Sequence, residues 1–304
     1  MTSDVRTGVR EPVIDQPLVR RLIAAQFPRW ADLPIRAVER SGWDNRTFHL
    51  GEQMVVRMPS AARYAAQVEK EQRWLPELAP SLPVPIPVPL AMGRPGDGYP
   101  WKWSVYGWLH GLTAAPERIG DMQRFARDLG AFLRALRRID PTGGPPPGRH
   151  NFYRGGALTT YDEEARRAIA ALAGEIDADA ARNAWEEALN AAWQGSSVWL
   201  HGDVSVGNLL VDRGRLSAVI DFGQLAVGDP ACDLAIAWTL FTGESRAAFQ
   251  ASVGLDPGMW ARGRAWALWK SLIVATGLTK TNALEATESH RIIEGILAEH
   301  RHEG

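Results

Sequence analysis

The spacing of apolar positions changes along the chain, and the N-terminal third alternates between helical and strand patterns. Residues 15–27 and 62–79 place their apolar side chains on one helical face. The Pro- and Gly-rich segment 80–100 predicts an extended connector. Strand patterns occur at residues 35–40, 47–50, 54–58 and 101–109. The second and third of these are predicted to form a hairpin through Gly51-Glu52-Gln53.

Helical spacing dominates the remainder of the chain. The clearest stretch is 120–139, which places Phe125, Leu129, Phe132 and Leu136 on one face. We expect an α+β fold with an N-terminal lobe at 1–109 and a larger, mainly helical lobe at 110–304. Further helices are predicted at 160–174, 178–194, 232–242, 258–277 and 283–300, and short strands at 198–200, 209–211 and 218–220.

Composition and charge are those of an ordinary globular protein. The 304 residues are 45% hydrophobic and 23% charged, and the formal net charge is −1. This balance predicts no binding to nucleic acid or to an anionic membrane. The first ten residues lack an apolar signal sequence and no apolar run could span a bilayer, so we expect a cytoplasmic protein. The single cysteine, Cys232, excludes a disulfide within the monomer, and the oligomeric state stays open.

Residues suited to phosphoryl transfer gather between positions 199 and 240. A His-Gly-Asp tripeptide ends at Asp203, Asn208 follows, and Asp-Phe-Gly begins at Asp221 after a short predicted hairpin. Phosphoryl transfer needs a carboxylate to orient the attacking hydroxyl and oxygen ligands for the metal ions on the phosphates. Asp203 would supply the first, and Asn208 and Asp221 the second. The chain has no P-loop signature, which excludes a P-loop enzyme.

The same stretch also allows a different class of enzyme. Residues 203–207 resemble the nucleophile elbow of a hydrolase, except that Asp203 stands where that motif has glycine. An esterase would use Ser205 as its nucleophile, so replacing Ser205 with alanine separates an esterase from a kinase.

These motifs resemble the aminoglycoside phosphotransferase family, which includes macrolide kinases and is related to choline kinases. That family carries His-Gly-Asp where protein kinases carry His-Arg-Asp, and a downstream Gly-Asp-Pro-x-x-Asp-Leu-Ala, which here is 228–235. The resemblance implies a two-lobed, protein-kinase-like fold, Mg²⁺, and ATP or GTP as phosphate donor. It also implies that Asp203 is the catalytic base and that Asn208 and Asp221 bind the metal.

The resemblance further implies nucleotide contacts from the N-terminal lobe. Arg57, where many relatives carry lysine, would contact the phosphates and pair with Glu71. The turn at 41–46 would cover the phosphates with backbone N–H groups. The nucleotide contacts expected in this lobe are therefore Arg57, Glu71, Gly42, Asn45, Trp108 and Leu109.

The acceptor is expected to be a small-molecule hydroxyl compound, and two patterns bear on its class. Residues 157–190 hold eight acidic residues and three arginines, a local charge of −5 that would attract a polycationic aminoglycoside, unless these are solvated helix faces. The 13 tryptophans would either line a pocket for a macrolide or only pack helices. The predicted function is kinase action on an aminoglycoside-type antibiotic, hence antibiotic resistance. The alternatives are a macrolide kinase, a metabolic amino-alcohol or sugar kinase, and a non-catalytic nucleotide-binding pseudokinase, which Arg57 alone favours.

Overall fold

The chain divides into two compact units. The computed structural model describes residues 12–39, 42, 44–254, 256, 258–279 and 283–303. The first unit runs to Pro80 and resumes at Pro87–Leu109, and the second contains Ser81–Ile86 and the chain from His110 onward. The sequence analysis assigned 81–86 to the N-terminal lobe. The segment instead groups with the second unit, where the carbonyl of Pro85 accepts the N–H of Val219 at 3.1 Å.

An antiparallel sheet forms the centre of the first unit, with the strand order β1-β2-β3-β5-β4. The predicted hairpin is present, and it pairs Thr47 with Arg57 and Leu50 with Met54. The prediction of a bare connector at 80–100 is wrong at its centre, because a strand forms there at the edge of the sheet. The strands of this sheet are β1 (Ile35–Ala37), β2 (Asn45–Leu50), β3 (Met54–Pro59), β4 (Pro89–Gly93) and β5 (Trp103–Gly107).

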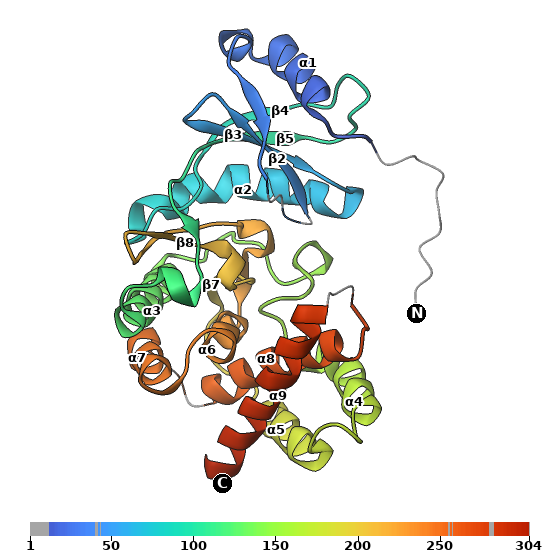
Figure 1. The fold of residues 1–304 in the computed structure, drawn as a ribbon, viewed down its shortest axis with the longest axis vertical. Coiled ribbons are helices and arrows are strands. Elements are labelled where there is room, and N and C mark those ends of the chain that lie inside the picture. Colours follow the sequence, from blue (N-terminus) through green and yellow to red (C-terminus); the bar gives the residue numbers. More distant parts are fainter. Residues whose placement is uncertain are drawn as a thin grey trace. The chain divides into compact units, whose positions relative to one another are not determined.

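Two helices cover the faces of this sheet, α1 (Gln16–Gln26) on one and α2 (Ala65–Leu78) on the other (Figure 1). The Asp15 carboxylate begins α1 by accepting the N–H of Leu18 at 2.9 Å, which satisfies one of the unpaired donors of the first turn. The apolar face of α1 then packs on the sheet, and the buried residues of this core include Leu18, Leu22, Ile23, Phe48, Val56 and Trp103.

Helices make up most of the second unit. The long helices α3 and α7 pack together, and Gly130 of α3 lies directly against Ser252 of α7. The sequence analysis predicted no helix at α7, and it assigned 232–242 to one helix where the structure has a 3₁₀ segment, Pro230–Ala235, before α6. The helices are α3 (Met122–Arg138), α4 (Asp162–Ala171), α5 (Ala178–Asn190), α6 (Ile236–Thr239), α7 (Gly243–Val253), α8 (Met259–Ala275) and α9 (Ala283–Glu303).

Short strands of the second unit position the loops that carry the predicted chemistry. β8 (Leu209–Asp212) lies between β6 (Leu112–Thr113) and β9 (Arg215–Val219), and β7 (Val198–Leu200) pairs with β10 (Ala226–Gly228). The loop at 201–208 therefore leaves one pair of strands and enters the other sheet. Asp221 follows β9 after a single residue.

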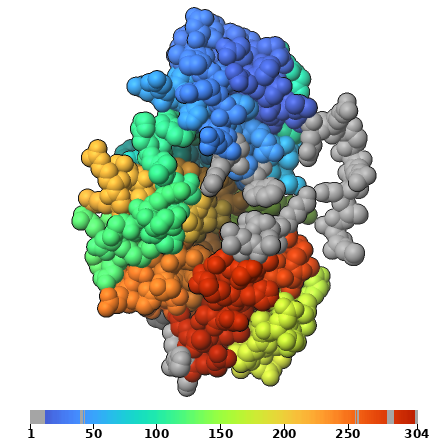
Figure 2. Space-filling model, viewed as in Figure 1, coloured from blue at the N-terminus to red at the C-terminus, as the bar shows by residue number. Residues whose placement is uncertain are grey.

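The C-terminal helix α9 packs against the segment that carries α4 and α5. Figure 2 shows this helix in red beside the yellow-green residues of that segment. Arg301 pairs with Asp177 at 2.9 Å, and His290 pairs with Glu175 at 3.1 Å. Within the described ranges, no helix combines the length and the apolar character that a bilayer crossing requires.

Candidate active site

Asp203 and Asn208 are in direct contact on the 201–208 loop. The side-chain amide of Asn208 donates from Nδ2 to the backbone carbonyl of Asp203 at 2.9 Å and to its Oδ2 at 3.2 Å. A turn makes this contact possible, because the N–H of Asn208 donates to the carbonyl of Ser205 at 2.9 Å. The five-residue spacing seen in the sequence thus folds into one compact group.

His201 is fully buried beneath this loop and links it to the next one. Its Nδ1 accepts the N–H of Asp203 at 3.2 Å, and its Nε2 lies 3.0 Å from the carbonyl of Ile220. These two bonds fit the imidazole tautomer that carries its proton on Nε2. Both nitrogens are used inside the protein, so His201 has a positioning part.

The motif glycine is required by the backbone. Gly202 has φ +86°, and a Cβ there would lie 2.5 Å from the carbonyl oxygen of Gln224. The buried carboxylate of Asp233 holds this sharp turn by accepting the N–H of His201 at 2.8 Å and that of Gly202 at 2.7 Å. Burial raises the pKa of Asp233, and the hydrogen bonds from the two backbone N–H donors oppose that rise.

Asp221 is fixed beside the same group of atoms by its neighbour in the chain. The N–H of Ile220 donates to the carbonyl of Asn208 at 2.9 Å, while the carbonyl of Ile220 faces His201. Asp221 itself has φ +66° and ψ +69°, a region that residues with a Cβ seldom occupy. Local strain of this kind gathers at functional sites, where the surrounding structure enforces it.

Two cations influence the predicted base, Asp203. Its Oδ1 lies 3.5 Å from Nζ of Lys270 on α8, and its side chain keeps 35% of its surface exposed. Burial raises the pKa of Asp203, but the charges of Lys270 and Arg154 outweigh it and hold this pKa below its usual range. Asp203 is therefore an ionised carboxylate at neutral pH, able to accept a hydrogen bond from a hydroxyl.

The oxygen atoms at this site suit a magnesium ion. Mg²⁺ is bound by carboxylate and amide oxygens together with phosphate oxygens. Because the Nδ2 of Asn208 is turned to Asp203, its other amide atom is the oxygen, which is the atom a metal needs. The carboxylate of Asp221 would supply the anionic ligand. No cluster of three or more His, Cys, Asp or Glu side chains suited to a metal occurs among the described residues, so any metal here would rely on Asn208 and on phosphate oxygens as well.

The residues predicted to contact nucleotide lie in the first unit, and two of them meet. Nη1 of Arg57 lies 3.7 Å from Oε1 of Glu71, whose other oxygen accepts the hydroxyl of Tyr106. Glu71 is buried, and the guanidinium of Arg57 stands over the ring of Tyr106 at 5.9 Å. Arg57 is thus held in place by a buried carboxylate and an aromatic ring.

The other residues predicted to contact nucleotide lie in different surroundings within the first unit. Gly42 is exposed, while Ser41 and Trp43 beside it lie outside the described residues. Asn45 is buried at the start of β2, opposite Pro59. The N–H of Trp108 donates to the carbonyl of Gln53 at 2.7 Å, so only its carbonyl would serve a base, together with the backbone of Leu109.

Comparison with known proteins identifies the family. The sequence profile of the phosphotransferase enzyme family matches residues 35–266. The chain belongs to the phosphotransferase enzyme family. The predicted family and the two-lobed, protein-kinase-like α+β fold are thereby confirmed, and solved structures with that fold match nearly all of the phosphotransferase.

Three solved structures illustrate the likeness. The GDP complex of aminoglycoside 2'-phosphotransferase-IIIa has a TM-score of 0.70 and 18% identity. The match covers 94% of the present chain and 99% of the chain of that enzyme. The ADP-bound aminoglycoside phosphotransferase APH(2'')-Ib has a TM-score of 0.59 and 17% identity, with 93% and 99% covered. The macrolide 2'-phosphotransferase from Brachybacterium faecium has a TM-score of 0.56 and 26% identity, with 92% and 98% covered. Comparison with functionally curated proteins gives no match.

The acidic residues at 157–190 are largely engaged inside the phosphotransferase. Arg166 pairs with Asp162 at 2.8 Å and with Glu186 at 2.6 Å, and Glu187 pairs with Arg264 at 2.7 Å. The other contacts of these acids are Arg182 with Asp179, Trp269 with Glu164, His290 with Glu175 and Arg301 with Asp177. The charge of −5 counted in the sequence already includes Arg166 and Arg182, so only bases from outside the segment, such as Arg264 of α8 and Arg301 of α9, offset part of it.

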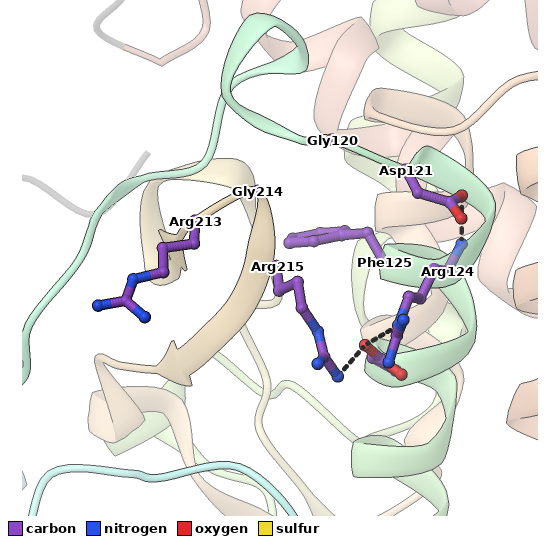
Figure 3. A pocket seen from close by; sticks show the side chains of 8 residues that line it. Gly120, Asp121, Arg124, Phe125, Arg213, Gly214 and Arg215 are labelled. Atoms are coloured by element: carbon purple, nitrogen blue, oxygen red, sulfur yellow. Dashed lines mark hydrogen bonds and ion pairs between the residues drawn. The ribbon is translucent and has the colours of Figure 1, made fainter.

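A pocket of about 190 Å³ lies in the second unit but contains none of the predicted catalytic residues. Figure 3 shows side chains of both signs around it, and Asp128 forms ion pairs with Arg215 at 3.9 Å and with Arg124 at 4.0 Å. Its lining holds three arginines and two aspartates, so its charge is slightly positive. The pocket is lined by Gly120, Asp121, Arg124, Phe125, Asp128, Arg213, Gly214 and Arg215.

The sequence analysis missed two cations that surround Asp203. Lys270 and Arg154 belong to segments distant in the sequence, and no motif marks either of them. One signal was available, because the chain has only four lysines. Because lysine is so scarce, each one is a candidate partner for the carboxylates of the motif.

Proposed function

We propose that the protein transfers the γ-phosphate of ATP or GTP to a hydroxyl group of a small molecule. The observation that carries this proposal is the contact of Asn208 with Asp203, joined through Ile220 to the strained Asp221. This is the set that in-line phosphoryl transfer needs, namely a base for the hydroxyl and oxygen ligands for the metal. Membership of the phosphotransferase enzyme family supports the same chemistry.

Each residue has a defined part in the proposed reaction. Asp203 accepts a hydrogen bond from the acceptor hydroxyl and aligns its oxygen with the γ-phosphorus, then takes its proton as transfer proceeds. Asn208 and Asp221 would hold Mg²⁺, which neutralises phosphate charge when bound. His201 and Asp233 keep the loop in the shape that places Asp203.

The nucleotide contacts are proposed in the first unit. Similar structures were determined with GDP, ADP and ATP, which supports a nucleoside triphosphate as donor. The pairing of Arg57 with Glu71 favours a phosphate contact for Arg57, since a positioned guanidinium is always charged and can bind phosphate oxygens in a bidentate way. Arg57 would thereby replace the lysine of related kinases.

The acceptor is proposed to be an antibiotic-type hydroxyl compound, because the similar structures include both aminoglycoside and macrolide kinases. The expected aminoglycoside stays a prediction. Its main support was the acidic segment at 157–190, and the ion pairs of that segment weaken this support. A macrolide is favoured by the 26% identity to a macrolide kinase.

Substitution of the proposed base tests the function. Asp203→Asn keeps the shape of the side chain but removes the proton acceptor, so transfer should fall by about 10²–10⁴-fold. Transfer from γ-labelled ATP and GTP is measured with kanamycin, gentamicin, streptomycin and a macrolide as acceptors. Magnesium-dependent hydrolysis of the nucleotide is measured in the absence of an acceptor. Nucleotide affinity, measured by titration calorimetry, should stay within about two-fold of the original value.

Ser205→Ala is the matched control on the same loop. It removes the nucleophile that an esterase would need and should leave transfer nearly unchanged. Full activity of the Asp203→Asn variant would refute Asp203 as base. Nucleotide binding without transfer or hydrolysis in the unaltered protein would instead support the pseudokinase alternative.

A further inference from the structure

A lysine stands beside the carboxylate that the acceptor must approach. Nζ of Lys270 is 3.5 Å from Oδ1 of Asp203, and Oδ2 of the same carboxylate takes the amide of Asn208. Lys270 keeps 46% of its side-chain surface exposed and Asp203 keeps 35%, so both side chains remain in contact with solvent. A molecule that reaches Asp203 from solvent therefore meets the ammonium group as well.

Arg154 adds a second positive charge to this region. Its charge acts on Asp203, and its guanidinium lies over the rings of Trp266 and Trp269 at 5.0 and 4.9 Å. Both tryptophans are buried in α8, and Tyr161 stacks on Trp269 at 4.1 Å. Arg154 is thus held by aromatic rings, and its charge is not cancelled by that contact.

The base is consequently bordered by positive charge on the side that Lys270 occupies. The carboxylate of Asp203 is paired with Lys270, and Arg154 contributes a further positive charge. An acceptor hydroxyl that donates to Oδ1 of Asp203 would lie within about 6 Å of the ammonium, given a hydrogen bond of about 2.7 Å.

We infer that Lys270 is a specificity-determining residue that disfavours acceptors carrying positive charge next to the reacting hydroxyl and favours those that are neutral or anionic there. The inference rests on the proposed function, since it takes Asp203 as the group that the acceptor hydroxyl approaches. Two like charges about 6 Å apart near a protein surface repel enough to weaken binding up to about 100-fold, and exposure to solvent lowers this to about ten-fold.

The test compares binding of kanamycin, a polycation, with that of erythromycin, which carries one amine. Dissociation constants are measured by titration calorimetry for the unaltered protein and for K270Q, K270E and K270R. Kanamycin should bind about ten-fold more tightly to K270Q and more tightly still to K270E, with a gain that shrinks as salt is added. Erythromycin has a single amine, beside a hydroxyl of its amino sugar, so it should gain affinity in K270Q by a smaller factor than kanamycin, and K270R should behave like the unaltered protein.

The matched control is K102Q, which removes the same charge from an exposed lysine of the first unit that is paired with Glu69. It should leave both dissociation constants unchanged. Equal affinity of kanamycin for all the Lys270 variants, including no measurable binding to any of them, would overturn the inference. So would a gain in K102Q that equals the gain in K270Q, because that would be an effect of net charge alone.

Transfer assays separate this inference from the proposed function. If the unaltered protein transfers phosphate but kanamycin affinity does not respond to Lys270, the inference fails and the proposed function survives. If affinity responds as expected but neither transfer nor magnesium-dependent hydrolysis occurs, the proposed function fails and the selection by charge stands as a property of binding. Where transfer is measurable, K270Q should change the KM for kanamycin more than it changes kcat.

Discussion

Asp203 and Asp233 have different roles in this protein because their surroundings differ. Asp203 is partly exposed beside cations, whereas Asp233 is buried and spends both oxygens on backbone N–H groups of the 201–208 loop. The first is suited to meet a substrate and the second to hold a turn. The hydrogen bonds of Asp233 are those of a scaffold residue.

Asp233→Asn should disturb the site without touching a substrate. The amide offers one acceptor where the loop presents two donors, so one buried N–H faces an NH₂ group and loses its partner. We expect a loss of about 1–3 kcal/mol in the free energy of unfolding and at least about a ten-fold fall in kcat. Urea unfolding and transfer assays check both. Asp212→Asn, an exposed carboxylate at the end of β8, should change neither, and unaltered kcat in Asp233→Asn would contradict the supporting part.

The residues that sequence reasoning could find are those that act within one short segment. Asp203, Asn208 and Asp221 have fixed chain spacing, because the turn and the hairpin between them are local structures. Lys270 reaches Asp203 only through the packing of α8 in the second unit. Such a contact has no local spacing to reveal it, which is why the sequence could not predict the charge around the base.

At the scale of elements, the hydrophobic pattern predicted an element correctly where one of its faces is buried along its whole length, and it failed elsewhere. α3 was predicted because its apolar face is continuous, with Phe125, Leu129 and Phe132 all buried. β4 was missed because proline suggests a connector, and an edge strand is the place in a sheet where proline is tolerated. α7 was missed because few large apolar side chains, such as Phe249 and Val253, mark its buried face.

The packing of α3 on α7 depends on a glycine. A Cβ at Gly130 would lie 2.8 Å from the Cβ of Ser252 and 3.1 Å from the N of Val253. Gly130→Ala should therefore push the helices apart and lower the free energy of unfolding by about 1–3 kcal/mol. Thermal or urea unfolding measures this change.

Gly295 on α9 provides the opposite case for comparison. No atom lies within 4 Å of the position a Cβ would take there, so Gly295→Ala gains helix propensity without a clash. It should raise the free energy of unfolding by about 0.5–1 kcal/mol. If both alanine variants shift stability in the same direction, close packing at Gly130 is not the cause.

At the scale of the whole second unit, one buried ion pair ties distant segments together. Arg262 of α8 is 3% exposed and donates to Asp229 at 2.8 Å, to Asp256 at 3.3 Å and to the carbonyl of Ala191 at 2.8 Å. Asp229 also begins the 3₁₀ segment at Pro230 by accepting the N–H of Ala231. Burial raises the pKa of Asp229, and Arg262 opposes that rise.

Arg262→Met should weaken the whole unit rather than one loop. It leaves the buried carboxylate of Asp229 without its cation, and losses of this kind reach about 3–5 kcal/mol. Urea unfolding followed by tryptophan fluorescence measures the effect. The double variant Arg262→Met with Asp229→Asn should recover part of the loss, because the unpaired charge is gone. A double variant no more stable than the single one would show that lost packing and the bond to Ala191, rather than charge, dominate.

The main-chain N–H and carbonyl of Ile220 connect the loops of Asp203 and Asp221. The side chain at position 220 takes no part in either bond. Exchange of this isoleucine for valine or leucine should accordingly leave the distance between the two loops unaltered. Exchange among aliphatic residues at position 220 would then conceal the part of its main-chain atoms, which keep the two loops in register.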